Sequence, residues 1–241
     1  MDRRIMLGGL PWSPASARPI AWYYAAGQYV SLNGATVSAW ADRMLAGSDV
    51  IQATPALQPT WEGSGGWGSG KPSIRSALQS LTSPSGGAAP IESVFSGLNK
   101  PFTILVTCQI LNYTGTVAIC SWNGGAGTTQ TCDVTAGQLM SSTRTDSGSS
   151  NTVTASANLV GSGHVRLAYS FGGDLMTMHL NTLQVASSSI VGGGGASVAW
   201  TSFTIASVRD MRITELIAVP RALSAAEVAL YYAYSLNEWG A

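Results

Sequence analysis

Short runs of β-branched and aromatic residues recur through the second half of the chain at intervals of about ten residues, with turn residues between them. Regular short strands of this kind are typical of an antiparallel sandwich, whereas alternating strands and helices would indicate a parallel sheet. The spacing therefore predicts an all-β fold. The expected strands lie in residues 101–110, 116–122, 129–136, 138–143, 151–157, 164–171, 174–181, 183–191 and 202–208.

Residues 20–61 repeat this pattern. The run AWYY at 21–24 is followed by a hairpin whose two arms, 28–32 and 36–40, meet at the Asn33-Gly34 dipeptide. Residues 62–70 have five glycines in nine positions, which predicts a loop, because glycine loses too much backbone entropy inside a strand or helix. Residues 78–90, rich in Ser, Gly and Pro, are expected to be a second loop.

The C-terminal segment is the one part of the chain with a helical pattern. Ser224 and Glu227 form a capping box, and Val228, Tyr231, Tyr232, Ser235 and Leu236 follow near helical spacing. At the other end, Pro11, Pro14 and Pro19 predict an irregular N-terminal arm over residues 1–18. We expect this arm to be packed against the protein or a neighbouring subunit, and residues 19–241 to form one domain.

Composition excludes several functions. Only 10% of the residues are charged, against about 25% in an ordinary soluble domain, and the formal net charge is zero. Nucleic acid is therefore not an expected partner, since phosphate binding needs a basic surface. No apolar run is long enough to span a membrane, so no membrane insertion is expected, and the N-terminus lacks the pattern of a secretion signal.

The three cysteines, Cys108, Cys120 and Cys132, form an odd set without a CxxC pair. This argues against a disulfide framework and a zinc site. Their twelve-residue spacing matches the strand spacing and could place thiols on adjacent strands. Buried, reduced cysteines acting as small hydrophobes are the favoured interpretation.

Two blocks of the sequence resemble the concanavalin A-like, laminin-G-like jelly-roll superfamily, in the form common in bacterial and phage surface proteins. The first block, residues 20–43 with 51–61 and 70–75, contains the Val-x-x-Trp-x-Asp pattern of Val37, Trp40 and Asp42. The second block, RITELIAVPRALSAAEV, is similar to the family's last strand and helix start, and Asn181 occupies an expected turn position. The resemblance implies an antiparallel jelly-roll sandwich with one short C-terminal helix.

The departures from the family concern calcium. Residues 43–46 replace the usual Ser-Gly-Asn-Gly, and residues 75–77 replace the usual Phe-Asp-Gly, near loops where several relatives bind calcium. Asp133, Asp146 and Asp174 lie in or beside expected turns but form no cluster in the sequence. We therefore expect no metal and no cofactor. Members of this superfamily bind sugars, bind proteins, cleave glycans or only pack, so the fold alone does not give the function.

The carboxylates argue against catalysis. The glucanase branch of the superfamily carries Glu-x-Asp-x-x-Glu on one strand, which places an acid and a nucleophile on one face. The five glutamates here, Glu62, Glu92, Glu215, Glu227 and Glu238, include no such pair, with each other or with an aspartate. His164 and His179 fit structural roles on neighbouring strands, and no nucleophile elbow is present. We expect no catalytic residues.

If the protein binds a glycan, it needs aromatic platforms and amide groups on loops. Trp67 in the Gly-rich loop and Trp122-Asn123 before a second Gly-rich turn qualify. These three residues, Trp67, Trp122 and Asn123, are the candidate ligand-binding set. The alternative, that both indoles fold back to close the ends of the sandwich, is favoured.

The leading hypothesis is a non-enzymatic structural subunit of a phage particle, a capsid decoration protein or tail component that binds itself and other virion proteins. A Ser/Thr/Gly-rich, low-charge surface without an export signal fits assembly in the host cytoplasm followed by lysis. Binding to a cell-surface glycan would be an added role. The alternatives are a free-standing carbohydrate-binding lectin-type module, extracellular or at the cell surface, and, less favoured, a glycan-cleaving enzyme. Sparse charge also predicts self-association into a closed homo-oligomer.

Overall fold

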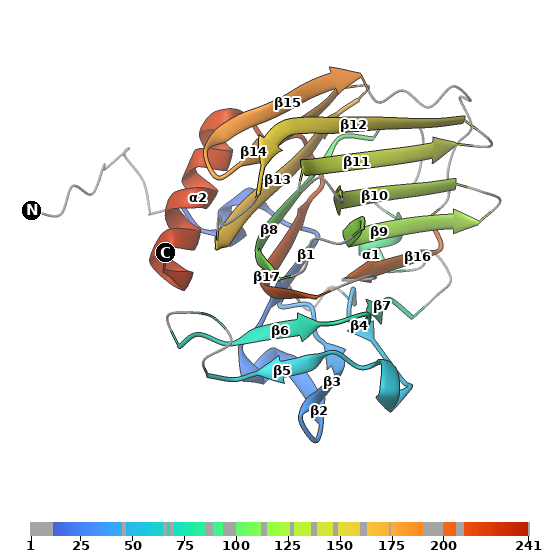
Figure 1. The fold of residues 1–241 in the computed structure, drawn as a ribbon, viewed down its shortest axis with the longest axis vertical. Helices are drawn as coiled ribbons and strands as arrows, with labels where there is room; N and C mark the ends of the chain where they lie inside the picture. The colour runs from blue at the N-terminus through green and yellow to red at the C-terminus, as the bar shows by residue number, and fades with distance from the viewer. Residues whose placement is uncertain are drawn as a thin grey trace, which may run out of the picture.

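A computed structural model shows an all-β sandwich with a C-terminal helix packed on the outside of one layer (Figure 1). The structure describes residues 12–44, 47–64, 67, 70–84, 89–93, 100–111, 115–125, 128–135, 139–146, 149–159, 163–173, 175–189, 200–205 and 210–240. The fold class predicted from the sequence is confirmed.

The strands of the N-terminal third are short. They are β1 Ala21–Tyr24, β2 Val30–Asn33, β3 Thr36–Trp40, β4 Val50–Ile51, β5 Thr60–Glu62, β6 Ser73–Ser76 and β7 Leu81–Thr82. Strand β7 is a correction, because residues 78–90 were expected to be loop throughout. It forms because Leu81 is buried in the core while Thr82 pairs with Thr204 of a later strand.

The later strands are longer and follow the predicted spacing. They are β8 Phe102–Ile110, β9 Val117–Gly125, β10 Thr128–Val134, β11 Leu139–Asp146, β12 Ser149–Asn158, β13 His164–Gly172, β14 Leu175–Leu180, β15 Leu183–Ser189, β16 Ser202–Ile205 and β17 Met211–Val219. Residues 136, 138, 174, 190, 191 and 206–208, which lie at the ends of five of the expected strands, are outside the described residues.

The pairings between strands define two layers. The first layer has the order β1–β17–β8–β13–β14–β15, with β6 pairing the beginning of β17 on the same side as β1. The second layer has the order β7–β16–β9–β10–β11–β12. Strands β2, β3, β4 and β5 connect the layers through β6 and β7 at the bottom of Figure 1.

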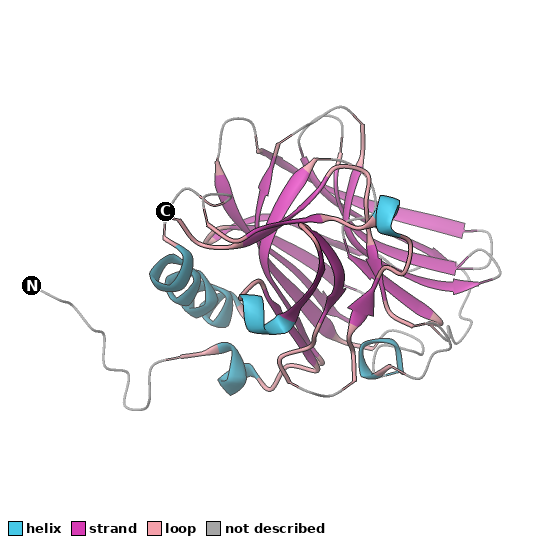
Figure 2. Cartoon of the chain, turned by 90° about the horizontal axis from the view of Figure 1, so that it is seen from below, coloured by secondary structure: helices cyan, strands magenta, loops and turns pink. Residues whose placement is uncertain are grey.

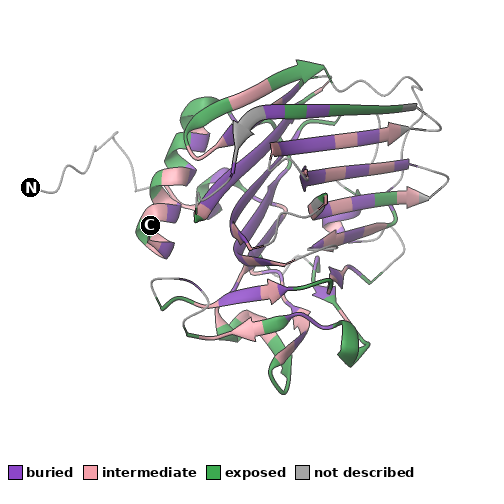
Figure 3. Cartoon of the chain, in the orientation of Figure 1, coloured by how far each residue is buried: buried purple, intermediate pink, exposed green. Residues whose placement is uncertain are grey.

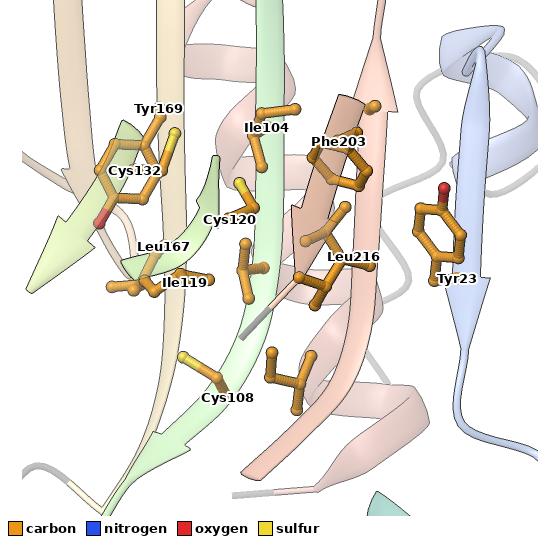
Figure 4. Packing of buried hydrophobic residues seen from close by; sticks show 14 of the residues in the cluster. Tyr23, Ile104, Cys108, Ile119, Cys120, Cys132, Leu167, Tyr169, Phe203 and Leu216 are labelled. Atoms are coloured by element: carbon orange, nitrogen blue, oxygen red, sulfur yellow. The ribbon is translucent and has the colours of Figure 1, made fainter. Parts of the chain in front are cut away.

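The main core lies between the two layers. Side chains from the central strands of the first layer, such as Ile104 and Leu216, meet Cys120, Cys132 and Phe203 from the second (Figure 4). Figure 3 shows the central strands as nearly continuous buried bands, because both faces of the first layer are covered. Burial on both sides explains why β8 is apolar along most of its length rather than alternating.

The C-terminal helix α2, Ala225–Trp239, covers the outer face of the first layer. Figure 2 shows it beside the sheet from below. Its first turn is held by the predicted capping box, in which Ser224 accepts from the Glu227 amide and the Glu227 carboxylate accepts from the Ser224 amide. Val228 and Tyr231 then pack on Leu105 and the neighbouring strands in a second, smaller core.

Four shorter helical turns complete the structure, namely η1 Pro14–Ala17, η2 Gly27–Tyr29, η3 Pro55–Leu57 and α1 Pro90–Ser93. The first belongs to the predicted arm, of which residues 1–11 lie outside the described residues. From residue 12 the arm packs on its own chain: Ala17 is buried in the second core, and the Trp12 ring lies 5.7 Å from the Tyr234 ring, centroid to centroid.

Candidate functional site

The most distinctive surface of the protein lies where β1 meets α2 and the η2 turn. Along β1, Ala21 and Tyr23 point into the main core, so Trp22 and Tyr24 point outward toward α2. The ring of Tyr29, from η2, meets the Tyr24 ring edge-on at 6.2 Å between centroids. Three aromatic rings from one short stretch of chain therefore gather on this surface. We call Trp22, Tyr24 and Tyr29 the aromatic cage.

Arg43 occupies this cage. Its guanidinium carbon lies 4.0 Å from the ring centroid of Trp22, 5.0 Å from Tyr24 and 5.6 Å from Tyr29. A guanidinium within about 6 Å of an aromatic face is attracted to it electrostatically. The cage thus holds a positive charge on a half-buried surface.

Hydrogen bonds of the backbone fix this arrangement. The Arg43 amide donates to the Trp22 carbonyl at 2.8 Å, and the Trp22 amide donates to Asp42 Oδ1 at 2.9 Å. Asp42 is fully buried and its Oδ1 also accepts from the Met44 amide. The Asp42 of the family pattern therefore ties the end of the β3 segment to β1, which places Arg43 against Trp22.

A buried carboxylate lies beneath the cage. Glu215, on β17, accepts from Trp22 Nε1 at 2.8 Å, from the Tyr234 hydroxyl at 2.9 Å and from Trp239 Nε1 at 3.3 Å. Burial raises the pKa of Glu215 to about 7, and the three donors only partly offset this effect. The hydroxyl of Tyr24 donates to a second carboxylate, Glu238, at the end of α2.

The fold thus brings two glutamates, Glu215 and Glu238, to one aromatic cluster although they lie far from any catalytic spacing in the sequence. Glu215 has no exposed surface and its oxygens accept from two indoles and a phenol, so it is not presented to a substrate. In the described part of the chain, no group of three or more His, Cys, Asp or Glu could hold a metal ion.

The three predicted ligand-binding residues differ in their exposure to solvent. Trp67 is fully buried, its indole Nε1 donates to the Trp239 carbonyl at 3.0 Å, and its ring stacks on His164 at 3.7 Å between centroids. Trp122 is also buried and its Nε1 donates to the Ile91 carbonyl. Both indoles are buried, so neither presents a face to solvent. Asn123 alone of the three is exposed.

Asn123 belongs to a second notable surface, the outer face of the second layer. Two rows of polar side chains cross its strands there. The first row consists of Thr82, Thr204, Ser121, Thr131, Thr143 and Thr152. The second row consists of Ser202, Asn123, Thr129, Thr145 and Ser150. Neighbouring hydroxyls bond directly, as Thr143 does with Thr152 at 2.9 Å. Among described residues the two rows contain no charge.

Several other residues singled out in the sequence are buried, namely the three cysteines, His179 and Asp133. Cys120 and Cys132 are direct partners on β9 and β10, as the spacing allowed, and all three cysteines are buried and free. His179 is buried on β14, where desolvation lowers its pKa. Asp133 is buried beside Thr131, and burial raises its pKa to about 6.

No family model matches the chain. No curated protein matches its sequence. Solved structures do match its fold. The binding domain of Paraclostridial Mosquitocidal Protein 1 gives a TM-score of 0.63 at 13% identity, covering 91% of this chain and 55% of that chain. Trypanosoma rangeli sialidase, in complex with 2,3-difluorosialic acid, gives 0.66 at 14% identity, covering all of this chain and 36% of that one.

A third similar structure is that of botulinum neurotoxin type C, which depends on interaction with two ganglioside molecules to enter cells. It gives a TM-score of 0.58 at 11% identity, covering 92% of this chain and 53% of that chain. The chain therefore spans about half the length of the toxin structures and about a third of the sialidase. At these identities the likeness shows the fold alone, which is the antiparallel β-sandwich expected from the sequence. The bacterial and phage surface-protein type stays a prediction.

No helix in the described part of the chain is both long enough and apolar enough to cross a membrane.

Proposed function

We propose that this protein is a non-enzymatic carbohydrate-binding module and that the aromatic cage with Arg43 is its binding surface. The observation that carries the proposal is the half-buried pair Tyr24 and Tyr29 beside the guanidinium of Arg43. Sugar rings present apolar C–H faces edged by hydroxyls, so they bind to aromatic surfaces that are flanked by hydrogen-bond donors. This site takes the place of Trp67 and Trp122.

Fold analogy supports the proposal without deciding it. The similar structures include a toxin that interacts with gangliosides and a sialidase holding a sialic acid derivative.

The proposal that the chain is not an enzyme rests on its glutamates. Each one bonds to another side chain: Glu62 to Arg212, Glu92 to Ser83, Glu215 to Trp22, Glu227 to Arg221 and Glu238 to Tyr24.

A glycan array with the purified protein tests the proposal. We expect binding that Tyr29→Ala weakens at least tenfold, because the substitution removes one wall of the cage. Tyr232→Ala is the matched control, since Tyr232 is a half-buried tyrosine on α2 whose ring lies by Arg166 instead. Binding that is lost equally in both variants, or release of reducing sugar from polysaccharide, would contradict the proposal.

The second candidate function is the structural subunit of a phage particle, assembled in the host cytoplasm and located in the virion. The uncharged rows of Ser, Thr and Asn on the second layer favour it. Their hydroxyl and amide groups can meet those of another copy, or of another virion protein, without desolvating a charge on the row residues themselves. On this proposal any glycan binding would serve attachment to a host surface.

Light scattering distinguishes the two. A structural subunit should form a closed oligomer that Thr143→Glu disrupts, because a carboxylate would then be buried between copies. Thr177→Glu, on β14 of the other layer, is the control. A lone species of about 24.9 kDa at high protein concentration would contradict this second candidate.

A further inference from the structure

We infer that the ligand of the aromatic cage carries a carboxylate, and that Arg43 binds it; this inference rests on the proposed carbohydrate-binding function. It would make the protein selective for acidic sugars over neutral ones.

The first step is that Arg43 has no acidic partner among the residues that the structure describes. Three other arginines of the described chain are ion-paired, Arg75 with Asp210, Arg212 with Glu62 and Arg221 with Glu227. Within the described part of the chain, the Arg43 side chain instead contacts the rings of Trp22, Tyr24 and Tyr29. In the part of the chain that the structure describes, no carboxylate lies within 4.0 Å of its guanidinium nitrogens.

The second step concerns the donors of the guanidinium. An arginine that rests one flat face on an indole uses that face for the cation–π contact, whereas its N–H groups point outward in the plane of the guanidinium. Those N–H groups match the two oxygens of a carboxylate in a bidentate arrangement. Arg43 can therefore lie against the rings of the cage and still present its N–H groups to a carboxylate.

The third step is that the nearby carboxylates accept hydrogen bonds from aromatic side chains and do not pair with Arg43. Glu215 accepts from Trp22, Tyr234 and Trp239, and Glu238 accepts from Tyr24. Both bond to the aromatic residues rather than to the guanidinium. A carboxylate on the ligand would thus give Arg43 the counterion that the described part of the chain does not supply.

The fourth step is preorganisation. The Arg43 backbone is bonded to Trp22, and the neighbouring Asp42 is buried and bonded to the Trp22 and Met44 amides. A ligand would therefore meet a side chain whose base is already fixed, which lowers the entropic cost of binding. The half-buried rings of Tyr24 and Tyr29, beside one carboxylate-binding fork, fit an acidic sugar such as a sialic acid or a uronic acid.

The test compares matched oligosaccharides by isothermal titration calorimetry. One pair is a lactose-based trisaccharide ending in N-acetylneuraminic acid against lactose, and a second is an oligoglucuronate against the corresponding glucose oligomer. We expect the acidic member of at least one pair to bind at least tenfold more tightly, with an affinity that falls as salt is added. Arg43→Gln should abolish the preference, so that the acidic and the neutral member of a pair bind with equal affinity.

Arg43→Lys sharpens the test, because it keeps the charge but removes the planar fork, and we expect it to lose most of the preference. Arg221→Gln is the control for removing a surface arginine, and thermal melts exclude unfolding. Equal binding of neutral and acidic members, or a preference that survives Arg43→Gln, overturns the inference and leaves the proposed function standing. Failure of every glycan to bind overturns both. Equal affinity for an acidic peptide overturns the assignment to sugars.

Discussion

The indole of Trp22 donates a hydrogen bond to the buried carboxylate of Glu215, with 2.8 Å between Nε1 and Oε1. The same indole carries the Arg43 guanidinium on its face. Trp22 therefore joins the surface cage to a titratable group that has no exposed surface.

Glu215 should make the protein less stable as the pH rises from about 4.5 to 7. Its pKa is about 7 in the folded protein and 4.5 ordinarily, so the folded state binds more protons over this interval. Stability is fully present below pH 4.5 and declines through pH 7, by about 3 kcal/mol at 1.36 kcal/mol per pKa unit. Glu215→Gln should flatten this slope in urea unfolding curves.

Glu227→Gln is the control for that experiment. The pairing of Glu227 with Arg221 lowers its pKa to about 2, so its contribution is present above the ordinary value and is lost as the pH falls below 4.5. It should not alter the slope between pH 4.5 and 7. Equal slopes in wild type and Glu215→Gln would contradict the assignment. Asp133, with its raised pKa of about 6, leaves a residual slope of the same sign.

Ser224→Ala should destabilise the protein by about 1 kcal/mol, since it removes the side chain that caps α2. Ser224→Asp should retain most of the stability, because its carboxylate can accept from the same amide. Chemical denaturation measures both. A loss as large in Ser224→Asp as in Ser224→Ala would show that the cap is not the cause.

Trp67→Ala should destabilise by about 3–5 kcal/mol, as expected for removing a buried indole. Trp67→Phe should cost less, because a ring still stacks on His164 and only the bond to the Trp239 carbonyl is lost. Thermal melts rank the variants. Unchanged stability of Trp67→Ala together with lost glycan binding would restore the platform interpretation of this residue.

The thiols should be unreactive in the folded protein. Cys108, Cys120 and Cys132 are all buried, and burial raises the pKa of Cys108 to about 12, which suppresses the reactive thiolate. We expect almost no reaction with Ellman's reagent under native conditions. In about 8 M urea, which unfolds the protein, three equivalents of thiol should react. Rapid labelling of the folded protein would contradict the burial.

Chelation with EDTA should leave the melting temperature unchanged. The residues that the structure describes hold no cluster of His, Cys, Asp or Glu fit for a metal ion. Differential scanning calorimetry with and without EDTA, followed by added calcium, measures this. A higher melting temperature in calcium would reveal a site that depends on residues beyond those described.

Local patterns in the sequence predicted the elements well. Strand runs such as 101–110 and 164–171 match β8 and β13 closely, because alternating or continuous burial imposes its own residue pattern. The Ser224 capping box started α2 as expected, since capping depends on residues three positions apart. Asn181 lies in a turn after β14, as expected, and its backbone is left-handed, with φ at 56°.

The candidate site was not predictable in the same way. Trp67 and Trp122 stand beside glycines, which suggested exposed platforms or end plugs, and only their burial decides between these. The alternation of Trp22 and Tyr24 on one strand could have placed both on one face. Nothing in the sequence placed Arg43 over them, because the contact depends on Asp42 bonding to the β1 backbone across twenty residues.

The amino-acid sequence by itself determined the all-β class, the strand spacing, the single long helix and the low content of charged residues, since each follows from residue types alone. The tertiary structure alone decided which aromatic residues are buried, that Arg43 lies against aromatic rings, and how Glu215 comes to lie beneath Trp22. These properties depend on contacts between segments that are distant in the chain, and the free energy of such contacts is set by burial and geometry rather than by local sequence.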